Sequence, residues 1–443
     1  MANPRSGTPT TSLERDARRI NEAHAAEVRP GDIAIGVIIG RTSEFFDFFV
    51  YAIASVVVFP QRVFPFVDEL TGTLYSFAVF AVAFLARPFG TVMFTAIDRT
   101  FGRGMKLLVA LFLLGTSTVA LAFLPGYDQI GLWSVWILIM MRCGQGLAMG
   151  GSWDGLPALL ALNAPKNRRG YYAMIPQLGA LIGLAIASAL FAFIISELTA
   201  TDFLDWGWRF PFFVAFAINV VALFARLRIV VTPEYTQAFD SQELQPSTIG
   251  ETIRHGGRTI VIGAFAPLAS FALFHMVTVF PLSWVFLYTQ DNPARFLVMQ
   301  AIGAALGVCS IYASGFLADR VGRKTLLGAT AAAIAAFSGF APQLLGGGEV
   351  GEAVFMASGY VLLGLSFGQA SGAVAASFPI QYRYTGSAMT SDLAWLFGAG
   401  FAPWVALMFS SKFGLAFAGV YLLSGALATL IALYLNRKTM QDR

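Results

Sequence analysis

Three charged side chains stand close together inside an otherwise apolar stretch near the start of the chain. Arg41, Glu44 and Asp47 occur in GRTSEFFDFFVY, between IAIGVII on one side and AIASVVVF on the other. A charge near the centre of a bilayer costs about 3 kcal/mol on insertion scales, so such residues usually face a protein interior or a water-filled cavity. A carboxyl group there can exchange protons when its access to water changes. We interpret Glu44 and Asp47 as proton-coupling residues; a self-compensating ion pair with Arg41 is the alternative.

Other ionisable side chains also lie inside apolar stretches. Arg142 is well inside its stretch, where a guanidinium must pair or be solvated, and it can hold a carboxylate through two hydrogen bonds. Arg87 can bind the same group or extend toward the membrane surface. Asp392 has no compensating charge nearby in MTSDLAWLF, and His275 can relay protons near neutral pH or be hydrogen-bonded within the bundle. Arg87 and Arg142 are therefore candidates for substrate binding, and Asp392 and His275 for proton coupling.

Polar and aromatic residues of several stretches can shape a cavity near the middle of the membrane, although packing or an interfacial belt is the simpler explanation for the aromatic ones. The candidates are Gln145, Gln177, Trp284, Tyr288 and Trp395.

Charged side chains inside the apolar stretches point to functional positions because the chain has few charged residues. The chain has 443 residues, of which 57% are hydrophobic and 12% are charged, whereas a soluble domain carries about 25% charged residues. It is therefore a polytopic membrane protein, and the apolar spans described next predict that it is all-α. The net charge of +4 does not indicate a nucleic-acid partner, since the basic residues stand in short connections between apolar spans. No cofactor is expected, and neither the two cysteines nor any other cluster suggests a metal site.

We count twelve apolar spans near the ~20 residues that cross a bilayer. They cover 32–59, 70–97, 105–124, 131–161, 170–196, 208–230, 258–288, 294–318, 325–345, 352–380, 384–411 and 414–435. Alternate connections are basic: the N-terminal tail, Arg99/Arg103/Lys106, Lys166/Arg168/Arg169, Arg226 to Arg258, Arg320/Arg323/Lys324, Arg383 and Arg437/Lys438. The positive-inside rule then places both termini in the cytoplasm.

An internal repeat divides the chain into two parallel halves. IDRTFGR after the second span matches ADRVGR after the eighth, and RRGYYA opens the fifth span as RYTGSA opens the eleventh. We expect a cytoplasmic tail over residues 1–30, six-helix halves over 31–231 and 258–436, a cytoplasmic linker over 232–257 and a second tail over 437–443.

These motifs resemble the major facilitator superfamily. GFLADRVGRK matches its cytoplasmic loop signature and RCGQG its fourth-helix signature, while DRTFGRG is an imperfect first copy of the loop. EFFDFFVY, ARPFG, LPGYDQIGLW, QGLAMGG, RRGYYA, DWGWRFPFF, TPEY and RYTGSA, in this order, are similar to the metabolite:proton symporter family. That family includes permeases for α-ketoglutarate, citrate, shikimate, aromatic acids and proline or betaine.

The resemblance implies twelve transmembrane helices in two pseudo-symmetric bundles, a bacterial inner-membrane location and a monomer. The loop signatures imply a gate latch, or a clamp that only fixes topology. Their residues are Asp98, Arg99, Gly102, Arg103, Gly315, Asp319, Arg320, Gly322, Arg323 and Lys324. Two positions depart from the family: Arg41 stands where relatives show Asn or Thr, and GGSWDG has Ser152 at the usual glutamate. Asp154, two residues on, is rotated by about 200° on a helix and cannot simply replace it.

Enzyme chemistry has little support, because the sequence contains no Walker loop, HExxH, CxxC pair or G-x-S-x-G elbow. We predict proton-coupled symport of a small organic anion, a mono-, di- or tricarboxylate taken up by alternating access. Three arginines of the N-terminal half are expected to hold the anion, Arg41, Arg87 and Arg142, and three acids to carry the proton, Glu44, Asp47 and Asp154. Protonating an acid would leave a positive pocket that a carboxylate neutralises, so the two ligands would be positively coupled. A zwitterion symporter, a drug/proton antiporter and a non-transporting receptor are the alternatives; the fifth span lacks the Gly-Pro pair of proton antiporters.

Overall fold

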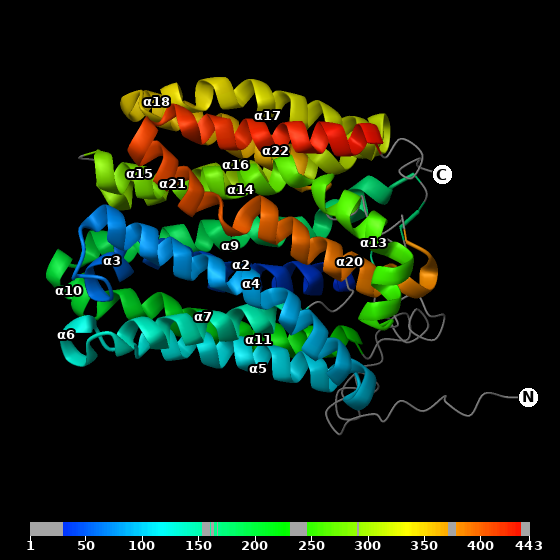
Figure 1. Ribbon diagram of the computed structural model, residues 1–443, viewed down its shortest axis with the longest axis horizontal. Coiled ribbons are helices and arrows are strands. Elements are labelled where there is room, and N and C mark those ends of the chain that lie inside the picture. Colours follow the sequence, from blue (N-terminus) through cyan, green and yellow to red (C-terminus); the bar gives the residue numbers. More distant parts are fainter. Residues whose placement is uncertain are drawn as a thin grey trace, which may run out of the picture.

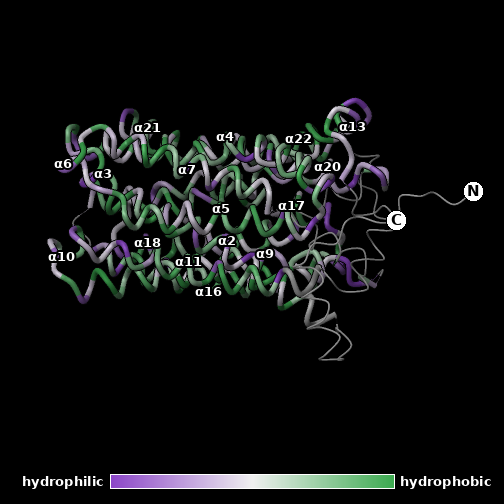
Figure 2. Tube along the Cα trace, turned by 90° about the horizontal axis from the view of Figure 1, so that it is seen from below, coloured by the Kyte–Doolittle hydropathy of each residue, from purple (hydrophilic) through white to green (hydrophobic). Residues whose placement is uncertain are grey.

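The computed structural model describes residues 30–152, 160, 164–165, 167–230, 246–289, 292–370 and 378–435, and these residues form helices joined by short connections. Ten membrane-spanning segments among them are long and apolar enough to cross a bilayer. Helices α2 and α7, which carry buried charges, bring the number of spans to the twelve expected from the sequence. Polar residues gather at the two ends of the bundle and apolar residues along its length (Figure 2).

The first six spans form one bundle. Their bounds are α2 (Pro30–Val57), α4 (Glu69–Phe101), α5 (Arg103–Ala122), α7 (Trp133–Gly151), α9 (Arg169–Glu197) and α11 (Phe210–Val230). Short turns of helix connect them: α3 (Phe59–Arg62), α6 (Tyr127–Ile130), α10 (Ala200–Asp205) and the 3₁₀ turn η1 (Gly207–Arg209). Within this half, α2 packs on α9 and α11, and α7 packs on α4 and α5.

The last six spans form the second bundle. Their bounds are α14 (Leu268–Thr278) continued by α15 (Phe280–Tyr288), α16 (Pro293–Val321), α17 (Arg323–Leu345), α18 (Gly348–Phe367), α20 (Ile380–Trp395) continued through the π-helical turn η2 (Leu396–Gly400) into α21 (Ala402–Phe413), and α22 (Ala416–Leu435). The two bundles lie side by side and meet where α9 packs along α16 and α4 packs on α20 and α21 (Figure 1).

Helix α13 (Ile249–Phe265) precedes the seventh span and corrects its predicted start. The span was expected over 258–288, but the membrane-spanning segment begins at Leu268, because α13 ends at Phe265 and packs against α20 and α22 at one end of the bundle (Figure 1). We call this end the α13 end. The tenth span was expected to run to 380, yet α18 ends at Phe367; residues 371–377, like most of the predicted linker, lie outside the described residues.

Helix starts follow from local capping. Asp68 precedes α4, and its carboxylate accepts the N–H of Thr71 at 3.0 Å and the Thr71 hydroxyl at 2.7 Å. Hydrogen bonds from Thr71 lower the pKa of this exposed carboxyl. Asn292 caps α16 in the same way by accepting from Ala294.

The two loop signatures share one turn geometry. Gly102 connects α4 to α5 with φ 83°, and Gly322 connects α16 to α17 with φ 85°. Only glycine adopts this left-handed region without steric cost. The internal repeat predicted from sequence is therefore present in the backbone, with a glycine turn at equivalent points of the two halves.

Small residues bring α9 close to α2. A Cβ at Gly179 would lie 2.6 Å from the Cβ of Arg41, and one at Gly183 would lie 2.8 Å from the backbone nitrogen of Phe46. Both distances are below normal contact, so these positions need glycine. The close approach places Gln177 of α9 beside Arg41 of α2, on the inner side of the bundle.

Candidate functional site

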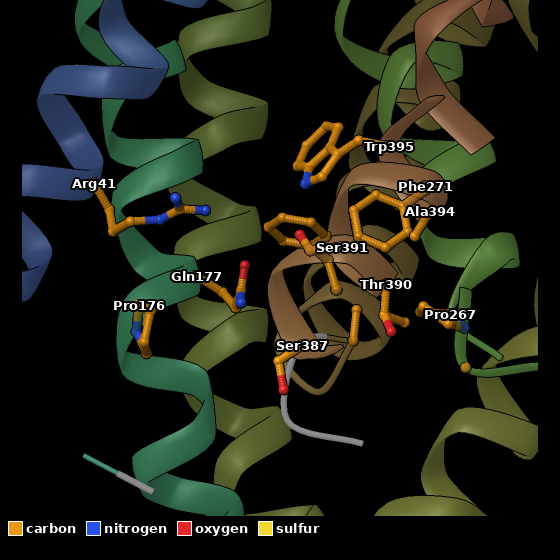
Figure 3. Close-up of a pocket in the computed structure, with 13 residues that line it drawn as sticks. Arg41, Pro176, Gln177, Pro267, Phe271, Ser387, Thr390, Ser391, Ala394 and Trp395 are labelled. Atoms are coloured by element: carbon orange, nitrogen blue, oxygen red, sulfur yellow. The ribbon is translucent and has the colours of Figure 1, made fainter. Parts of the chain in front are cut away.

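A cavity lies between the two bundles, with residues of both halves in its wall. Its first part has about 580 Å³ of empty space and is lined by α2, α9, the α13–α14 turn, α18 and α20 (Figure 3). Its second part has about 460 Å³ and is lined by α2, α4, α7 and α20. Arg41 and Trp395 line both parts. A cavity between the halves agrees with the sequence prediction.

Hydrogen-bonding groups point into the first part from opposite walls. The guanidinium of Arg41 extends from α2 toward the open space, with the amide of Gln177 below it (Figure 3). Across the space, the indole nitrogen of Trp395 faces Arg41, and the hydroxyl of Ser391 projects from the same helix (Figure 3). The buried Ser387 hydroxyl also lines this part and has no hydrogen-bond partner among the described residues.

Glu44 is held between two arginines. Its Oε2 lies 2.7 Å from Nη1 of Arg41, and its Oε1 lies 2.6 Å from Nη2 of Arg226. The ion pair with Arg41, which the sequence analysis gave as the alternative to proton coupling, is therefore present. Arg226 was placed in the cytoplasmic connection, which is wrong: its side chain is 2% exposed within α11, and Nη1 donates to the Ser152 carbonyl. Its place inside the apolar stretch 208–230 was the available signal.

Asp47 is buried without a cation. It is 1% exposed, and within the described part of the chain no basic group lies within 4 Å of its carboxylate. The hydroxyl of Thr118 donates to its Oδ2 at 3.1 Å, and the amide of Asn219 donates to the same oxygen. Ser43 in turn donates to Asn219 at 2.7 Å. Asp47 thus sits at the centre of a polar network on α2, α5 and α11; Thr118 and Asn219 were not singled out from sequence.

The same network reaches Arg142. Nη1 of Arg142 donates to Gln145 at 3.1 Å, and the Gln145 amide donates to Thr118 at 2.9 Å. The guanidinium also donates to the Phe80 carbonyl at 3.2 Å and lies 4.1 Å from the centre of the Tyr51 ring. Cation–π contact and neutral hydrogen-bond acceptors thus surround the guanidinium. Neither Arg142, 0% exposed, nor Gln145 appears in the cavity wall, so the structure does not place these two candidates against a substrate.

Asp392 forms an ion pair with Arg87, which corrects the expectation that it is uncompensated. Nε of Arg87 lies 2.7 Å from its Oδ1, and the hydroxyl of Thr91 donates to its Oδ2. Arg87 and Thr91 belong to α4 and Asp392 to α20, so the pair joins the two halves. Arg87 also lines the second part of the cavity.

His275 lies in an aromatic cluster between the halves. Its ring stacks on Phe48 at 5.3 Å and meets Phe80 edge-on at 5.4 Å. It is 0% exposed, Nε2 has no partner among the described residues, and Thr278 lies at the 3.5 Å limit from Nδ1. The cluster includes cavity-lining rings and closes the space on the side away from α13: Phe45, Phe48, Phe84, Phe271, Phe367 and Trp395.

Trp284 and Tyr288 do not line the cavity. Their ring centroids lie 4.3 Å apart in a tilted arrangement on α15, and Tyr288 is 46% exposed. An interfacial position at the end of the span opposite α13 explains them better than substrate binding. Asp154 lies outside the described residues.

The loop signatures make contacts across the two halves. Oδ1 and Oδ2 of Asp319 accept the N–H groups of Gly170 at 2.6 Å and of Tyr171 at 3.1 Å, at the start of α9. Asp98 faces Arg103 and Lys106, each at 3.6 Å. Of the other signature residues, Arg323 donates to the Arg169 carbonyl, Gly315 packs against α9, and the side chains of Arg99 and Arg320 are exposed, while Lys324 is half-buried.

Lys106 adds a contact that the sequence did not indicate. Its ammonium donates to the Tyr384 hydroxyl of α20 at 2.7 Å, and the guanidinium of Arg103 lies 5.1 Å from the Tyr384 ring centre. Both contacts cross between the halves near the α13 end. A gate latch at this end remains a prediction.

Comparison with known proteins gives a consistent result. The family model described as "Sugar (and other) transporter" matches residues 33–257. The chain is 35% identical to the "Inner membrane metabolite transport protein YhjE" of Escherichia coli, over 92% of this chain and 94% of that protein. It is 29% identical to the shikimate transporter of Escherichia coli, over 92% and 94%, and 27% identical to its proline/betaine transporter, over 89% and 80%.

Solved structures agree on the fold. The crystal structure of a D-xylose-proton symporter superposes with a TM-score of 0.72 and 18% sequence identity, covering 93% of this chain and 99% of that one. At 18% identity this comparison shows a shared arrangement of helices.

Proposed function

Since this chain belongs to the sugar (and other) transporter family of the major facilitator superfamily, we propose that it is a proton-coupled symporter of a small organic anion. The observation that carries the proposal is the position of Arg41, a guanidinium that lines both parts of a cavity shared by the two halves. Transport, rather than enzyme chemistry, is the role that the relatives' names support.

The anion is held by donors of the cavity wall. Arg41 supplies a charge-assisted contact, and the Trp395 indole N–H and the Gln177 amide supply neutral ones. A carboxylate accepts from all three groups. Two relatives are named for shikimate and for proline and betaine, compounds that each carry a carboxyl group, which supports a carboxylate as the common feature.

The proton is carried by Asp47. It is a carboxyl group with only neutral hydrogen-bond donors in contact, one helical turn from the cavity-lining Glu44. Such a group can hold or lose a proton without breaking an ion pair. Arg142 acts on it through Gln145 and Thr118, and is a positioning residue in this proposal rather than a ligand of the anion.

Alternating access follows from the two halves. Residues 31–231 and 258–436 then move as two bodies linked by 232–257. According to the positive-inside rule, the α13 end and both termini lie in the cytoplasm. Opening this end requires the contacts of Asp319 and of Lys106 to break. A single chain contains the whole cavity, so a monomer is sufficient.

Uptake into proteoliposomes tests the coupling. Influx should follow an imposed inward proton gradient, collapse with a protonophore and not require sodium. Asp47→Asn should abolish the pH dependence while retaining binding. Sodium-dependent uptake that resists the protonophore would refute the proposal.

A thermal-shift screen against carboxylates, zwitterions and cations at two pH values tests the ligand. A charge-assisted hydrogen bond contributes about 2–3 kcal/mol, so Arg41→Gln should weaken the apparent affinity roughly 30- to 150-fold. The matched control is Arg295→Gln, which removes an arginine from an exposed ion pair with Glu349 and should leave affinity unchanged. If only cations bind, the anion proposal is wrong.

A zwitterion is the second candidate, favoured by the aromatic lining. The rings of Phe45, Phe48 and Trp395 flank Arg41 in the second part of the cavity. Aromatic faces attract a quaternary ammonium by about 0.5–2 kcal/mol, while Arg41 would hold the carboxylate. Tight binding of betaine, together with no binding of a carboxylate of similar shape that lacks the quaternary ammonium, would favour this candidate.

A further inference from the structure

Helix α20 presents three hydrogen-bonding side chains to the first part of the cavity. Ser387, Ser391 and Trp395 follow one another at intervals of four residues, and all of them line this part. At about 3.6 residues per turn, this spacing places them on one face of the helix, each about one turn after the last. In Figure 3 these side chains lie on the wall opposite Arg41 and Gln177. The C-terminal half therefore supplies a polar face across the cavity from the guanidinium of the N-terminal half.

The two serine hydroxyls have no hydrogen-bond partner within the described part of the chain. A serine or threonine in a helix commonly donates to a carbonyl three or four residues earlier, as Thr390 does to Gly386 at 2.7 Å. The Ser387 hydroxyl makes no such bond, although the residue is only 9% exposed, and the Ser391 hydroxyl makes none either. A buried hydroxyl without a hydrogen bond is destabilising, so a polar group of a bound substrate would stabilise this face.

We propose that Ser387 and Ser391 are specificity-determining residues that bind the hydroxyl groups of the substrate, and that the substrate class is therefore a hydroxylated carboxylate. This inference rests on the proposed function, because it takes the carboxylate to be held at Arg41. A serine hydroxyl donates one hydrogen bond and also accepts, and a substrate hydroxyl does the same. A second carboxylate only accepts and an ammonium only donates, so each would use only part of what the two serines offer.

The rest of the wall favours the same division of the substrate. Apolar side chains form most of the remaining lining of this part: Pro176, Pro267, Phe271, Phe367, Ala370 and Ala394. They fit the carbon skeleton, while the Ser387 and Ser391 hydroxyls and the Trp395 indole take its polar groups. A site that hydrogen-bonds a substrate hydroxyl discriminates against the analogue that lacks it, because its own buried polar groups are then left unpaired.

Binding of matched probe pairs to purified full-length protein tests the inference. Butyrate and β-hydroxybutyrate differ by one hydroxyl, and cyclohexanecarboxylate and quinate share a ring but differ in its hydroxyls. Dissociation constants are measured by calorimetry, and their ratio within a pair is the preference for hydroxyls. The variants are Ser387→Ala, Ser391→Ala and the double variant. Ser424→Ala is the matched control, because its exposed hydroxyl donates to the Tyr421 carbonyl on α22.

Wild-type protein should bind the hydroxylated member of at least one pair about tenfold or more tightly. A neutral hydrogen bond contributes roughly two- to tenfold in affinity, so each single variant should lower the preference by that factor and the double variant should lower it further. Ser424→Ala should keep the wild-type preference. The preference is the readout because a merely structural serine would change both constants of a pair alike.

A wild-type preference below about tenfold in both pairs, including failure to bind either member, overturns the inference. A preference that stays at the wild-type value in every recovered serine variant also overturns it. Failure of the proposed function is distinct: Arg41→Gln would then weaken neither member of a pair, or wild-type protein would bind cations alone. If Arg41→Gln weakens both members while the serine variants keep the wild-type preference, only the inference about α20 fails.

Discussion

Replacing Asp319 by Asn should open the α13 end of the transporter. The carboxylate accepts two backbone N–H groups from the first turn of α9, at 2.6 Å and 3.1 Å, and so joins the C-terminal half to the N-terminal half. An amide keeps one acceptor and presents a donor to the other N–H. Losing a charge-assisted hydrogen bond destabilises the closed state by about 1.5–3 kcal/mol. This cost shifts the equilibrium between closed and open states roughly 10- to 150-fold toward the open state.

Labelling of a reporter cysteine measures this shift. Ser391→Cys places a thiol in the cavity wall, in a background where Cys143 and Cys309 are replaced by Ser. A membrane-impermeant maleimide is added from the α13 side, and the labelling rate should rise by at least tenfold with Asp319→Asn. Glu349→Gln, which disrupts an exposed ion pair worth less than about 1 kcal/mol, is the control. A labelling rate within threefold of the parent, in a variant that remains folded, would show that Asp319 is a topological clamp and not a latch.

Three further outcomes follow from the packing and the polar network. Gly322→Ala should lower the melting temperature, because φ 85° strains any side chain by more than about 1 kcal/mol; Gly339→Ala, whose Cβ meets nothing within 4 Å, should not lower it. Gly183→Val should destabilise the N-terminal half by about 1–3 kcal/mol through overpacking against α2, seen as a lower melting temperature and reduced expression. Arg142→Gln should alter the pH profile of uptake while the anion affinity stays within threefold; a 30-fold loss of affinity would instead place Arg142 at the substrate.

Sequence patterns predicted most of the architecture; the start of the seventh span and the end of the tenth were the exceptions. A bilayer requires about 20 apolar residues per helix and internal satisfaction of every backbone group, so hydropathy determines where the spans lie. The resemblance to the major facilitator superfamily is confirmed by the family match and the shared fold. Two local features were also within reach of the sequence. Arg41 and Glu44 are three residues apart on one helix and form the ion pair that was given as the alternative, and both loop signatures contain the glycine that their turns require.

Only the tertiary structure decided which charges face one another across helices. Glu44 and Arg226 are 182 residues apart, and Thr91 and Asp392 are 301 apart. A sequence specifies angular position within one helix, at 3.6 residues per turn, but not how neighbouring helices are rotated and shifted against each other. For that reason Arg142 appeared to be a substrate ligand, whereas aromatic rings and the network of Asp47 surround it. For the same reason Asp392 appeared uncompensated, whereas the packing of α4 on α20 brings Arg87 to it.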